Sequence, residues 1–485
     1  MRRTPLLLLA LLAGCSMEPK YVQPASPVPP SWPVGDAYLQ QSEAALPALT
    51  YRDVFRDPRL QSLVEQALLN NRDLRIAAAN IAAARAQYRI QRAERFPEVG
   101  VSTGATVTDR GVDQTGSGGG GSGGANTSFT ADLGITAFEL DLFGRVAALT
   151  RAEQNRFFAT EAAARTTRLA LVGDIADAWL TYGADASLLK IAQETAVSAE
   201  STVRLTRARL EGGIAPRTDL RQAEQILEAA RANIAEQRTA LAQDVNLLQL
   251  LVGTPIDAAL LPASIDEAAA TVAQLPAGLE STILLRRPDV VEAEFQLRAA
   301  NAEIGAARAA LFPRISLTGL LGFASDALTG LISGGGFNWT GGADVSYPIF
   351  RAGAGRAGVR LTEAQRASAV ATYERTIQIA FREVADALAR NGTMTEQLRA
   401  RLAQRDAAAD TYRLTEARYR GGIDPFLTSL EAQRDLYNSD LTLVTTRLTA
   451  ASNRVTLYRA LGGDSFLQSG AIDAVLPAGT GPQRR

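Results

Sequence analysis

Hydrophobic residues recur with a helical period over four long stretches of the chain. Two of them, about 145 to 211 and 357 to 420, are each followed by a shorter helical stretch. In the first shorter stretch the apolar positions recur every seven residues: Leu220, Leu227, Ile234, Leu241 and Leu248. In the second they step by four and three, with Arg434 in the same row: Leu430, Tyr437, Leu441, Val444, Leu448, Ala451, Val455 and Tyr458. Heptad spacing of this kind predicts a seam between helices that coil around each other.

The length of these stretches separates two interpretations. An amphipathic helix docked on a globular core seldom exceeds about 25 residues. A helix of about 65 residues would reach about 100 Å at 1.5 Å per residue. The pattern therefore favours long coiled-coil helices.

A second pattern, with period two, follows each of two Phe-Pro pairs, at 96–97 and 312–313. Alternating apolar and polar residues predict strands with one apolar face. Each such run is followed by a loop and a second alternating run, which predicts hairpins at about 98–142 and 314–348. The expected apolar faces are Val99, Val101, Ala105 and Val107 with Phe129, Ala131, Leu133, Ile135 and Ala137, and Ile315, Leu317, Leu321 and Phe323 with Phe337, Trp339, Ala343, Val345 and Tyr347.

The predicted strands have about ten to twelve residues each, which is the length that a tilted strand needs to cross a membrane. A soluble two-stranded ribbon is the alternative, but an isolated hairpin is only marginally stable and leaves its edges exposed. Two hairpins cannot close a barrel by themselves. The pattern therefore predicts several subunits that share one membrane barrel.

Both patterns occur twice because the chain is internally duplicated. The stretch RLTRARLEGGIAP (204–216) returns as RLTEARYRGGIDP (413–425), with nine of thirteen positions identical. The segments 72–101 and 288–317 also align. Paired glycines allow the left-handed dihedrals that end a helix, and a proline shortly afterwards can occupy the first turn of the next helix. The motif therefore predicts the turns of two helical hairpins, at Gly212, Gly213 and Pro216 and at Gly421, Gly422 and Pro425.

The predicted fold class is mostly α with membrane β. The chain is expected to be internally duplicated, with a long coiled-coil α-barrel and a β-barrel shared between protomers, four strands per chain. The expected segments are a signal peptide at 1–14, a lipidated N-terminal tether at 15–56 that is Pro-rich and extended at 19–34, a first repeat at 57–252 with its helical turn near 212–216, a connecting strap at 253–280, a second repeat at 281–462 with its turn near 421–425, and an irregular tail at 463–485.

The N-terminus, MRRTPLLLLALLAGCS, resembles a bacterial lipoprotein signal. Two arginines precede an apolar run, Leu6 to Leu12, that is too short to span a bilayer. In such signals the cysteine, here Cys15, is lipidated and becomes the first residue, and Ser16 after it implies sorting to the outer membrane. An ordinary cleaved signal with an incidental cysteine is the alternative. A multiply acylated cysteine is a firm anchor, because each buried methylene contributes about 0.8 kcal/mol.

Composition excludes several kinds of chemistry. The 485 residues include 50 Lys and Arg against 51 Asp and Glu. The net charge is therefore close to zero and gives the protein no overall electrostatic attraction to nucleic acid. The chain has no histidine and one cysteine, which excludes a Ser-His or Cys-His hydrolase and an intrachain disulfide. The glycine-rich run at 118–121 lacks the Lys-Ser/Thr ending of a phosphate-binding loop. We expect no catalysis, no metal site and no cofactor apart from the covalent lipid on Cys15.

The whole set of motifs resembles the outer membrane factors of the TolC-like family, especially the lipoprotein branch of OprM-like and NodT-type efflux proteins. The matching features are the lipobox at Cys15, the two Phe-Pro pairs, the Asp-Leu-Phe-Gly-Arg run at 141–145, the Tyr-Pro-Ile-Phe run at 347–350 and the two Gly-Gly turns. The resemblance implies a homotrimer in which each protomer gives four strands to one outer-membrane barrel. The barrel would continue into a periplasmic tunnel of α-helices.

The resemblance also implies that side chains near the helical turns close the periplasmic mouth. The matching positions are Arg217, Thr218 and Asp219 after the first turn, and Asp424 and Glu431 after the second. Tyr419 matches a tyrosine that pairs across the closed mouth. Asp424 stands where the family pattern has a basic residue, so the closing network is expected to be rearranged.

Two interpretations of the acidic residues stay open. A ring of carboxylates at a narrow entrance favours cations. Alternatively, Asp219 and Glu431 only complement the dipoles of helix first turns. Arg434 is either the partner of an interhelical salt bridge or a charge that faces the lumen.

The resemblance implies an outer-membrane exit duct that passively conducts drugs or other small toxic compounds. Its partners would be a periplasmic adaptor (a membrane fusion protein), an inner-membrane pump of the RND type and outer-membrane lipid. A type I-like protein secretion channel and a non-pore, structural coiled-coil lipoprotein are the alternatives; the lipobox argues against the first and the alternating hairpins against the second. Metal-ion export is a further alternative, although three methionines and no histidine offer few soft ligands.

Overall fold

The computed structural model describes residues 16–35, 37–38, 50–109, 125–274, 281–331 and 336–463. The predicted signal peptide, Cys15, the glycine-rich run at 118–121 and the tail after residue 463 lie outside the described residues. The described chain forms two compact units. The first comprises the described parts of 1–24, 82–159 and 293–372, and the second those of 25–81, 160–292 and 373–463.

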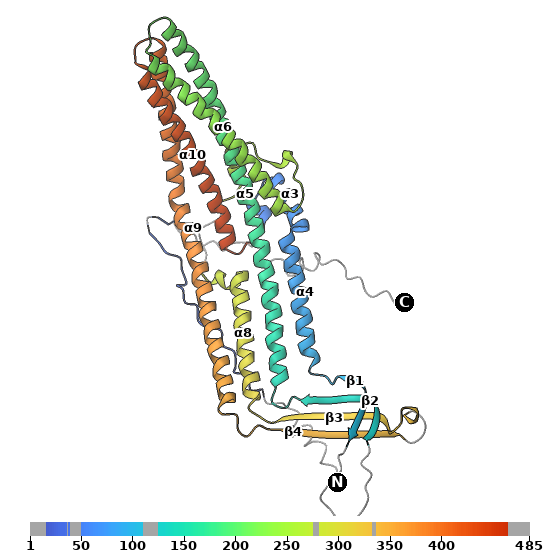
Figure 1. Cartoon of the computed structure of the whole chain (residues 1–485). Coiled ribbons are helices and arrows are strands. Elements are labelled where there is room, and N and C mark those ends of the chain that lie inside the picture. Colours follow the sequence, from blue (N-terminus) through green and yellow to red (C-terminus); the bar gives the residue numbers. More distant parts are fainter. Residues whose placement is uncertain are drawn as a thin grey trace, which may run out of the picture. The chain divides into compact units, whose positions relative to one another are not determined.

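The first unit contains one antiparallel sheet of four strands in the order β1-β2-β3-β4 (Figure 1). The strands are β1 (Val99–Asp109), β2 (Ala125–Leu140), β3 (Arg314–Ser325) and β4 (Phe337–Ser346). β2 pairs with β3, so the hairpins of the two repeats join into one sheet. One row crosses all four strands: Val101, Leu133, Leu321 and Trp339.

A β-bulge in β2 corrects one expected face. The register shifts between Ile135 and Phe138, and Ala137 adopts a positive φ of 54°. Because a bulge adds one residue to one strand, the alternation resumes one residue later. Phe138, and not Ala137, therefore lies opposite Leu317 on the apolar face.

The apolar face of the sheet is exposed in the single chain. The exposed fraction is 74% for Val101, 71% for Trp339 and 55% for Leu321. Bulky apolar residues gathered on one face are normally covered by protein or lipid. The opposite face carries mostly small and polar residues such as Ser102, Gly134 and Thr340.

The run at 141–145 connects the sheet to helix α5 (Arg145–Glu211). Arg145 donates two hydrogen bonds to the Glu139 carboxylate, at 2.8 and 2.7 Å. Asp141 Oδ2 accepts from the amide of Ala147 at 2.7 Å, which satisfies a free N–H of the first turn of α5. Phe143 stacks on Phe312 with ring centroids 4.6 Å apart. These contacts fix the direction in which the chain leaves β2.

The N-terminal segment is extended, but it is docked and does not behave as a free tether. In the first unit Pro19 O accepts from Asn301 Nδ2 at 2.8 Å, and Arg298 lies over the Tyr21 ring at 5.0 Å. A Cβ at Gly305 would come within 2.9 Å of Glu18, so the glycine permits the close approach. In the second unit Trp32 is buried and stacks on Phe381. These contacts cannot be predicted from the proline-rich composition alone.

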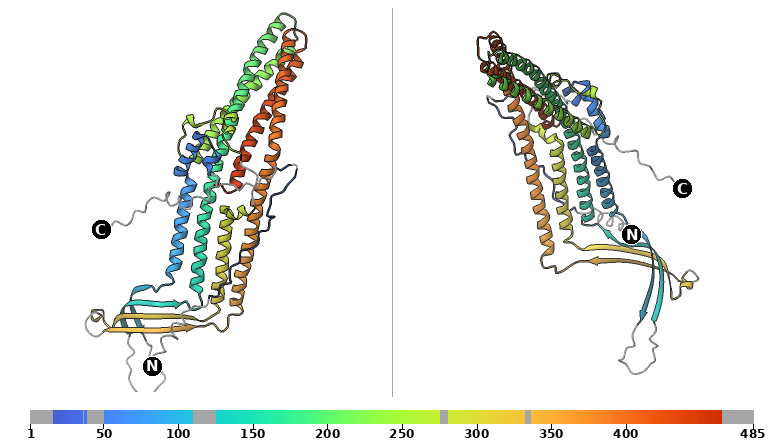
Figure 2. Two further views of the ribbon diagram at one scale, coloured as in Figure 1. Left: turned by 180° about the vertical axis from the view of Figure 1, so that it is seen from behind. Right: turned by 45° about the horizontal axis from the view of Figure 1, so that its top comes forward.

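Within the second unit, which contains α5 from residue 160 and α9 (Ala354–Arg420) from residue 373, two helical hairpins lie side by side with their turns at the same end (Figures 1 and 2). The hairpins are formed by α5 with α6 (Arg217–Val252) and by α9 with α10 (Phe426–Ala460). The remaining helices of the described chain are α2 (Tyr51–Val54), α3 (Pro58–Asn70), α4 (Arg72–Ala93), η1 (Ala258–Leu260), α7 (Ile265–Ala270), η2 (Ser281–Arg286), α8 (Pro288–Ala309) and η3 (Leu328–Gly330). Across the described helices, none is both long and apolar enough to cross a membrane.

The connecting strap packs into the core of the second unit. Trp179 of α5 is fully buried, and its indole N–H donates to Leu260 O at 3.0 Å. Arg454 of α10 donates to Val272 O at 2.8 Å. Ile265 of α7 is also fully buried. Residues 253–274 therefore bind α5 and α10 and do not form a loose connection.

The seam between α5 and α6 contains two carboxyl groups. Leu220, Leu227 and Leu248 are buried in it, whereas Ile234 and Leu241 are half-buried. The second heptad row of α6 reads Ala223, Ala230, Gln237 and Asp244. Asp244 shares a hydrogen bond with Asp185 of α5, and burial together with that neighbouring acid raises the pKa of Asp244 to about 6.

This pair predicts a seam that weakens as the pH rises. Because the folded pKa of Asp244 lies above the ordinary value, the folded state binds the proton more tightly, and stability falls as the pH rises towards and through 6. Asp244→Asn should therefore raise the melting temperature at pH 7.5 and leave it unchanged near pH 4. Circular dichroism of the helices in detergent measures both. Asp386→Asn, at an exposed position of α9, is the control and should change neither. An Asp244→Asn variant that is less stable at pH 7.5 would contradict this account.

Candidate functional site

The two Gly-Gly turns have the same backbone geometry. Gly213 and Gly422 adopt left-handed φ values of 73° and 75°. The amide of the next residue, Ile214 or Ile423, donates to the carbonyl five residues earlier, at 2.8 and 2.9 Å. This is the Schellman arrangement, in which glycine avoids the Cβ clash of the left-handed region and satisfies free helix carbonyls.

The prolines lie one position earlier than the sequence predicts. Pro216 and Pro425 are the N-cap residues of α6 and α10, with ψ of 156° at both. The helices begin at the next residue, so each proline precedes the first turn. The missing N–H of proline has no helical partner there, and the extended ψ directs the chain back along the preceding helix.

The ends of the two hairpins share one small core, which we call the tip core. Its buried members come from all four helices: Ala199, Val203, Leu220, Ala223, Leu227, Tyr419, Phe426 and Leu430. Two of these, Tyr419 and Phe426, are in ring contact at 5.3 Å. Packing across both hairpins therefore fixes the turns of one chain relative to each other.

Tyr419 is a member of the tip core and is only 4% exposed. Its hydroxyl lies 3.3 Å from Thr206 Oγ1, and the Arg209 guanidinium lies 4.5 Å from its ring centroid. Arg209 also donates to Arg420 O at 3.1 Å, at the C-terminus of α9. The side chain of Tyr419 is thus engaged within its own chain. Pairing of Tyr419 across a closed mouth stays a prediction.

Asp424 is also engaged within its own turn. Arg418 binds its carboxylate through two hydrogen bonds, at 2.6 and 2.9 Å. This guanidinium lowers the pKa of Asp424 below its ordinary value. The acid that replaces a basic residue of the family pattern therefore pairs with an arginine six residues before it.

The remaining predicted residues lie on the surface near the turns. Arg217 and Thr218 are exposed at the start of α6, Asp219 is half-buried, and Glu431 is exposed on α10. Thr218 Oγ1 lies 3.5 Å from Asp219 Oδ1. None of the salt bridges among the described residues includes Arg217, Asp219 or Glu431. Their charges are therefore available for contacts outside the chain.

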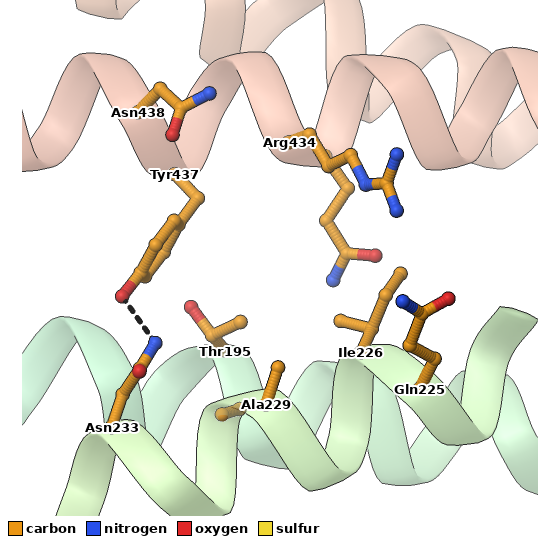
Figure 3. A pocket seen from close by; sticks show the side chains of 10 residues that line it. Thr195, Gln225, Ile226, Ala229, Asn233, Arg434, Tyr437 and Asn438 are labelled. Carbon is orange, nitrogen blue, oxygen red and sulfur yellow. Dashed lines mark hydrogen bonds between the residues drawn. The ribbon is translucent and has the colours of Figure 1, made fainter.

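A groove that the sequence did not predict lies between α6 and α10, with a volume of about 350 Å³ (Figure 3). It is lined by Thr195, Gln225, Ile226, Ala229, Ala230, Asn233, Gln433, Arg434, Tyr437 and Asn438. Asn233 Nδ2 donates to the Tyr437 hydroxyl at 2.7 Å across it. Arg434 lies at its edge and is exposed, and no salt bridge within the described chain includes it. No local sequence pattern marks this groove, because its lining comes from segments that are distant in the sequence.

Within the described residues, no group of three or more Asp, Glu and Cys side chains is arranged to hold a metal ion. The other prominent surface is the apolar face of the sheet, and two further apolar side chains are exposed after the end of β4. Ile349 and Phe350, of the Tyr-Pro-Ile-Phe run, are 93% and 87% exposed. The described features are thus an uncovered apolar sheet face and a charged surface near two helical turns.

Comparison with known proteins places these features in context. The family described as "Outer membrane efflux protein" matches residues 63–254 and 279–463. The antibiotic efflux pump outer membrane protein ArpC of Pseudomonas putida is 45% identical over 95% of both chains. Outer membrane protein OprJ of Pseudomonas aeruginosa is 40% identical over 94% of this chain and 95% of its own.

Solved structures agree with this match. The open-state crystal structure of the Neisseria gonorrhoeae MtrE outer membrane channel has a TM-score of 0.81 and 32% identity. It covers 93% of this chain and 98% of that one. The structure of the CusC channel has a TM-score of 0.82 and 34% identity, covering 93% of this chain and 100% of its own.

The two glycines of each turn should respond differently to alanine. Gly422→Ala places a Cβ in the left-handed region and should cost about 1 kcal/mol. Gly421→Ala is the matched control, because its nearest Cβ contact is 3.4 Å and its φ is not positive. Hydrogen exchange of the amides around 418–426 should be faster only in Gly422→Ala. Equal exchange in the two variants would contradict the assigned geometry.

Proposed function

The chain belongs to the outer membrane efflux protein family, and from that premise we propose how it works: three copies form one exit duct across the outer membrane. As an efflux component of the outer membrane, it provides the last passage out of the cell. The proposed assembly gives each protomer four strands in a common barrel of about twelve. The long helices would extend the bore as a periplasmic tunnel.

The observation that carries this proposal is the sheet. It has one face of exposed, bulky apolar residues and an opposite face of small and polar ones. A membrane barrel needs this arrangement, with apolar side chains towards lipid and polar side chains towards the bore. The outer strands β1 and β4 have partners on one side only within the described sheet. Lipid offers no hydrogen bonds, so these edges require neighbouring copies.

Cys15 is proposed as a lipid anchor. The docking of the residues after it supports this proposal: Ser16 and Glu18 both contact Arg151 of α5, through Arg151 Nη2 to Ser16 Oγ at 3.4 Å and Arg151 Nε to Glu18 Oε2 at 2.5 Å. These contacts hold the chain directly behind Cys15 on the unit that contains the sheet. An acyl chain on Cys15 would then lie beside the same membrane that the strands cross.

Outer-membrane components of efflux pumps work with a periplasmic adaptor and an inner-membrane pump. We propose a pump of the RND type for this chain, with energy supplied by the pump and no reaction catalysed by the duct. The names of relatives, which include antibiotic and toluene efflux proteins of Pseudomonas putida, support antibiotics and small apolar compounds as substrates.

The periplasmic mouth is proposed to close at the helical turns. Asp219 and Glu431 are the best candidates, because their carboxylates have no ion-pair partner within the described chain. Arg217 and Thr218, at the exposed start of α6, are secondary candidates. Tyr419 and Asp424 are engaged inside their own tip, so we leave them out of the contacts between copies.

Two adjacent residues on opposite faces of β3 test the duct. Leu321 lies on the exposed apolar face and Leu320 on the other. An arginine that faces lipid costs about 2–4 kcal/mol at mid-membrane, whereas the bore tolerates one. In a deletion strain, the wild type and Leu320→Arg should restore resistance to antibiotics and toluene, and Leu321→Arg should not. Deletion that leaves susceptibility to antibiotics, dyes and toluene unchanged would contradict an efflux role.

The proposed closure is tested separately in planar bilayers. Combined Asp219→Ala and Glu431→Ala should raise the single-channel conductance, because contacts between copies at the mouth are lost. Asp386→Ala, which removes an exposed acid of α9 well before its turn, serves as the control and should leave conductance unchanged. Unaltered conductance in the double variant would remove both residues from the account of closure.

A further inference from the structure

A single carboxylate lies in the middle of the polar face of the sheet. Asp132 of β2 pairs with Ser102 of β1 and with Gly322 of β3, and Gly322 pairs with Asn338 of β4. Paired residues of neighbouring strands share one face. The four residues therefore form a row, here called the Asp132 row, on the face opposite the exposed apolar residues.

The sheet provides space for this carboxylate. A Cβ at Gly322 would lie 2.0 Å from Asp132 Oδ1 and 2.6 Å from Ala131 O, so any side chain there would displace the acid. Other positions on the same face near the row are also glycines, at Gly100, Gly104 and Gly134. The carboxylate thus lies on a part of the face that small residues leave open.

The charge of Asp132 is not compensated. No salt bridge of the described residues includes Asp132. The helix-side end of the same face differs, because Glu139 binds Arg145 at 2.7 Å and Asp344 shares that end with Arg314. Both acids at that end therefore have an arginine nearby, one from α5 and one from β3. Asp132 is therefore the charged residue of the described strands that lies in the middle of the polar face, and it has no ion-pair partner among the described residues.

We infer that Asp132 gives the bore through the sheet a preference for cationic over anionic compounds. The inference rests on the proposed duct, in which the polar face lines the bore. Three copies then place three carboxylates at one level. Low-dielectric walls focus the field of such a ring, which concentrates cations and excludes anions. Organic amines that carry a positive charge are the substrate class that this ring favours, whereas acidic compounds are disfavoured.

The ion selectivity of the channel in planar bilayers tests this inference. The variants remove the negative charge from Asp132 or move it to another position of the Asp132 row. The ratio of K⁺ to Cl⁻ permeability, from reversal potentials in a KCl gradient, should exceed one for the wild type. Asp132→Asn should lower this ratio at least about twofold. Adding Asn338→Asp to Asp132→Asn returns the charge to the same row and should restore the ratio. All three chains keep the same helical tips, so differences among them report on the row.

The outcomes separate the inference from the duct itself. Normal conductance with the same permeability ratio in the wild type and Asp132→Asn would overturn the inference and leave the duct intact. A lowered ratio that Asn338→Asp fails to restore would also overturn it, because the effect would then not be one of charge in the bore. If the wild type forms no channel, the duct and the inference both fail. Normal conductance, a lowered ratio and its rescue together support it.

Discussion

Backbone hydrogen bonding at the edges of a four-stranded sheet is the constraint on which the rest of this structure depends. β1 and β4 each have a partner on one side only within the described sheet. An unsatisfied amide or carbonyl costs several kcal/mol in the hydrocarbon region, so a sheet there must close on itself. Four strands are too few to do so. The exposed apolar row through Val101, Leu133, Leu321 and Trp339 makes lipid the natural neighbour of one face, and the edges then require further copies of the chain.

The helical tips differ from the sheet, because the contacts that stabilise each tip lie within one chain. The tip core, the Arg209 contact to Arg420 O and the Arg418–Asp424 pair all lie within one chain. The turns of both hairpins are therefore preformed before any assembly. What is left for contacts between copies, or with an adaptor, is the exposed surface around Asp219 and Glu431. The duct is thus expected to close through a few surface charges, while the buried residues keep the shape of each tip.

Much of this architecture could be predicted from the sequence because the signals are local. Period-two alternation marks the strands, Gly-Gly marks the left-handed turns, and the 204–216 repeat at 413–425 reveals the duplication. The corrected strand face and the contacts that the sequence did not predict depend on distant segments. The bulge moves Phe138 onto the apolar face because β3 sets the register, and Tyr419 is buried because Thr206 and Arg209 of the other hairpin receive it. The docking of Pro19 on Asn301 and the groove beside Tyr437 have no local signature either.

The sharing of one sheet by several chains is the central claim, and the mass of the detergent-solubilised particle tests it most directly. Native mass spectrometry of the full-length, membrane-extracted protein should give a protein mass close to three times that of one mature chain, with strand content retained in its circular dichroism spectrum. Three chains supply enough strands to satisfy both edges of every sheet. A stable particle of one chain that keeps its four strands would contradict the account, because its edges would then need no partner.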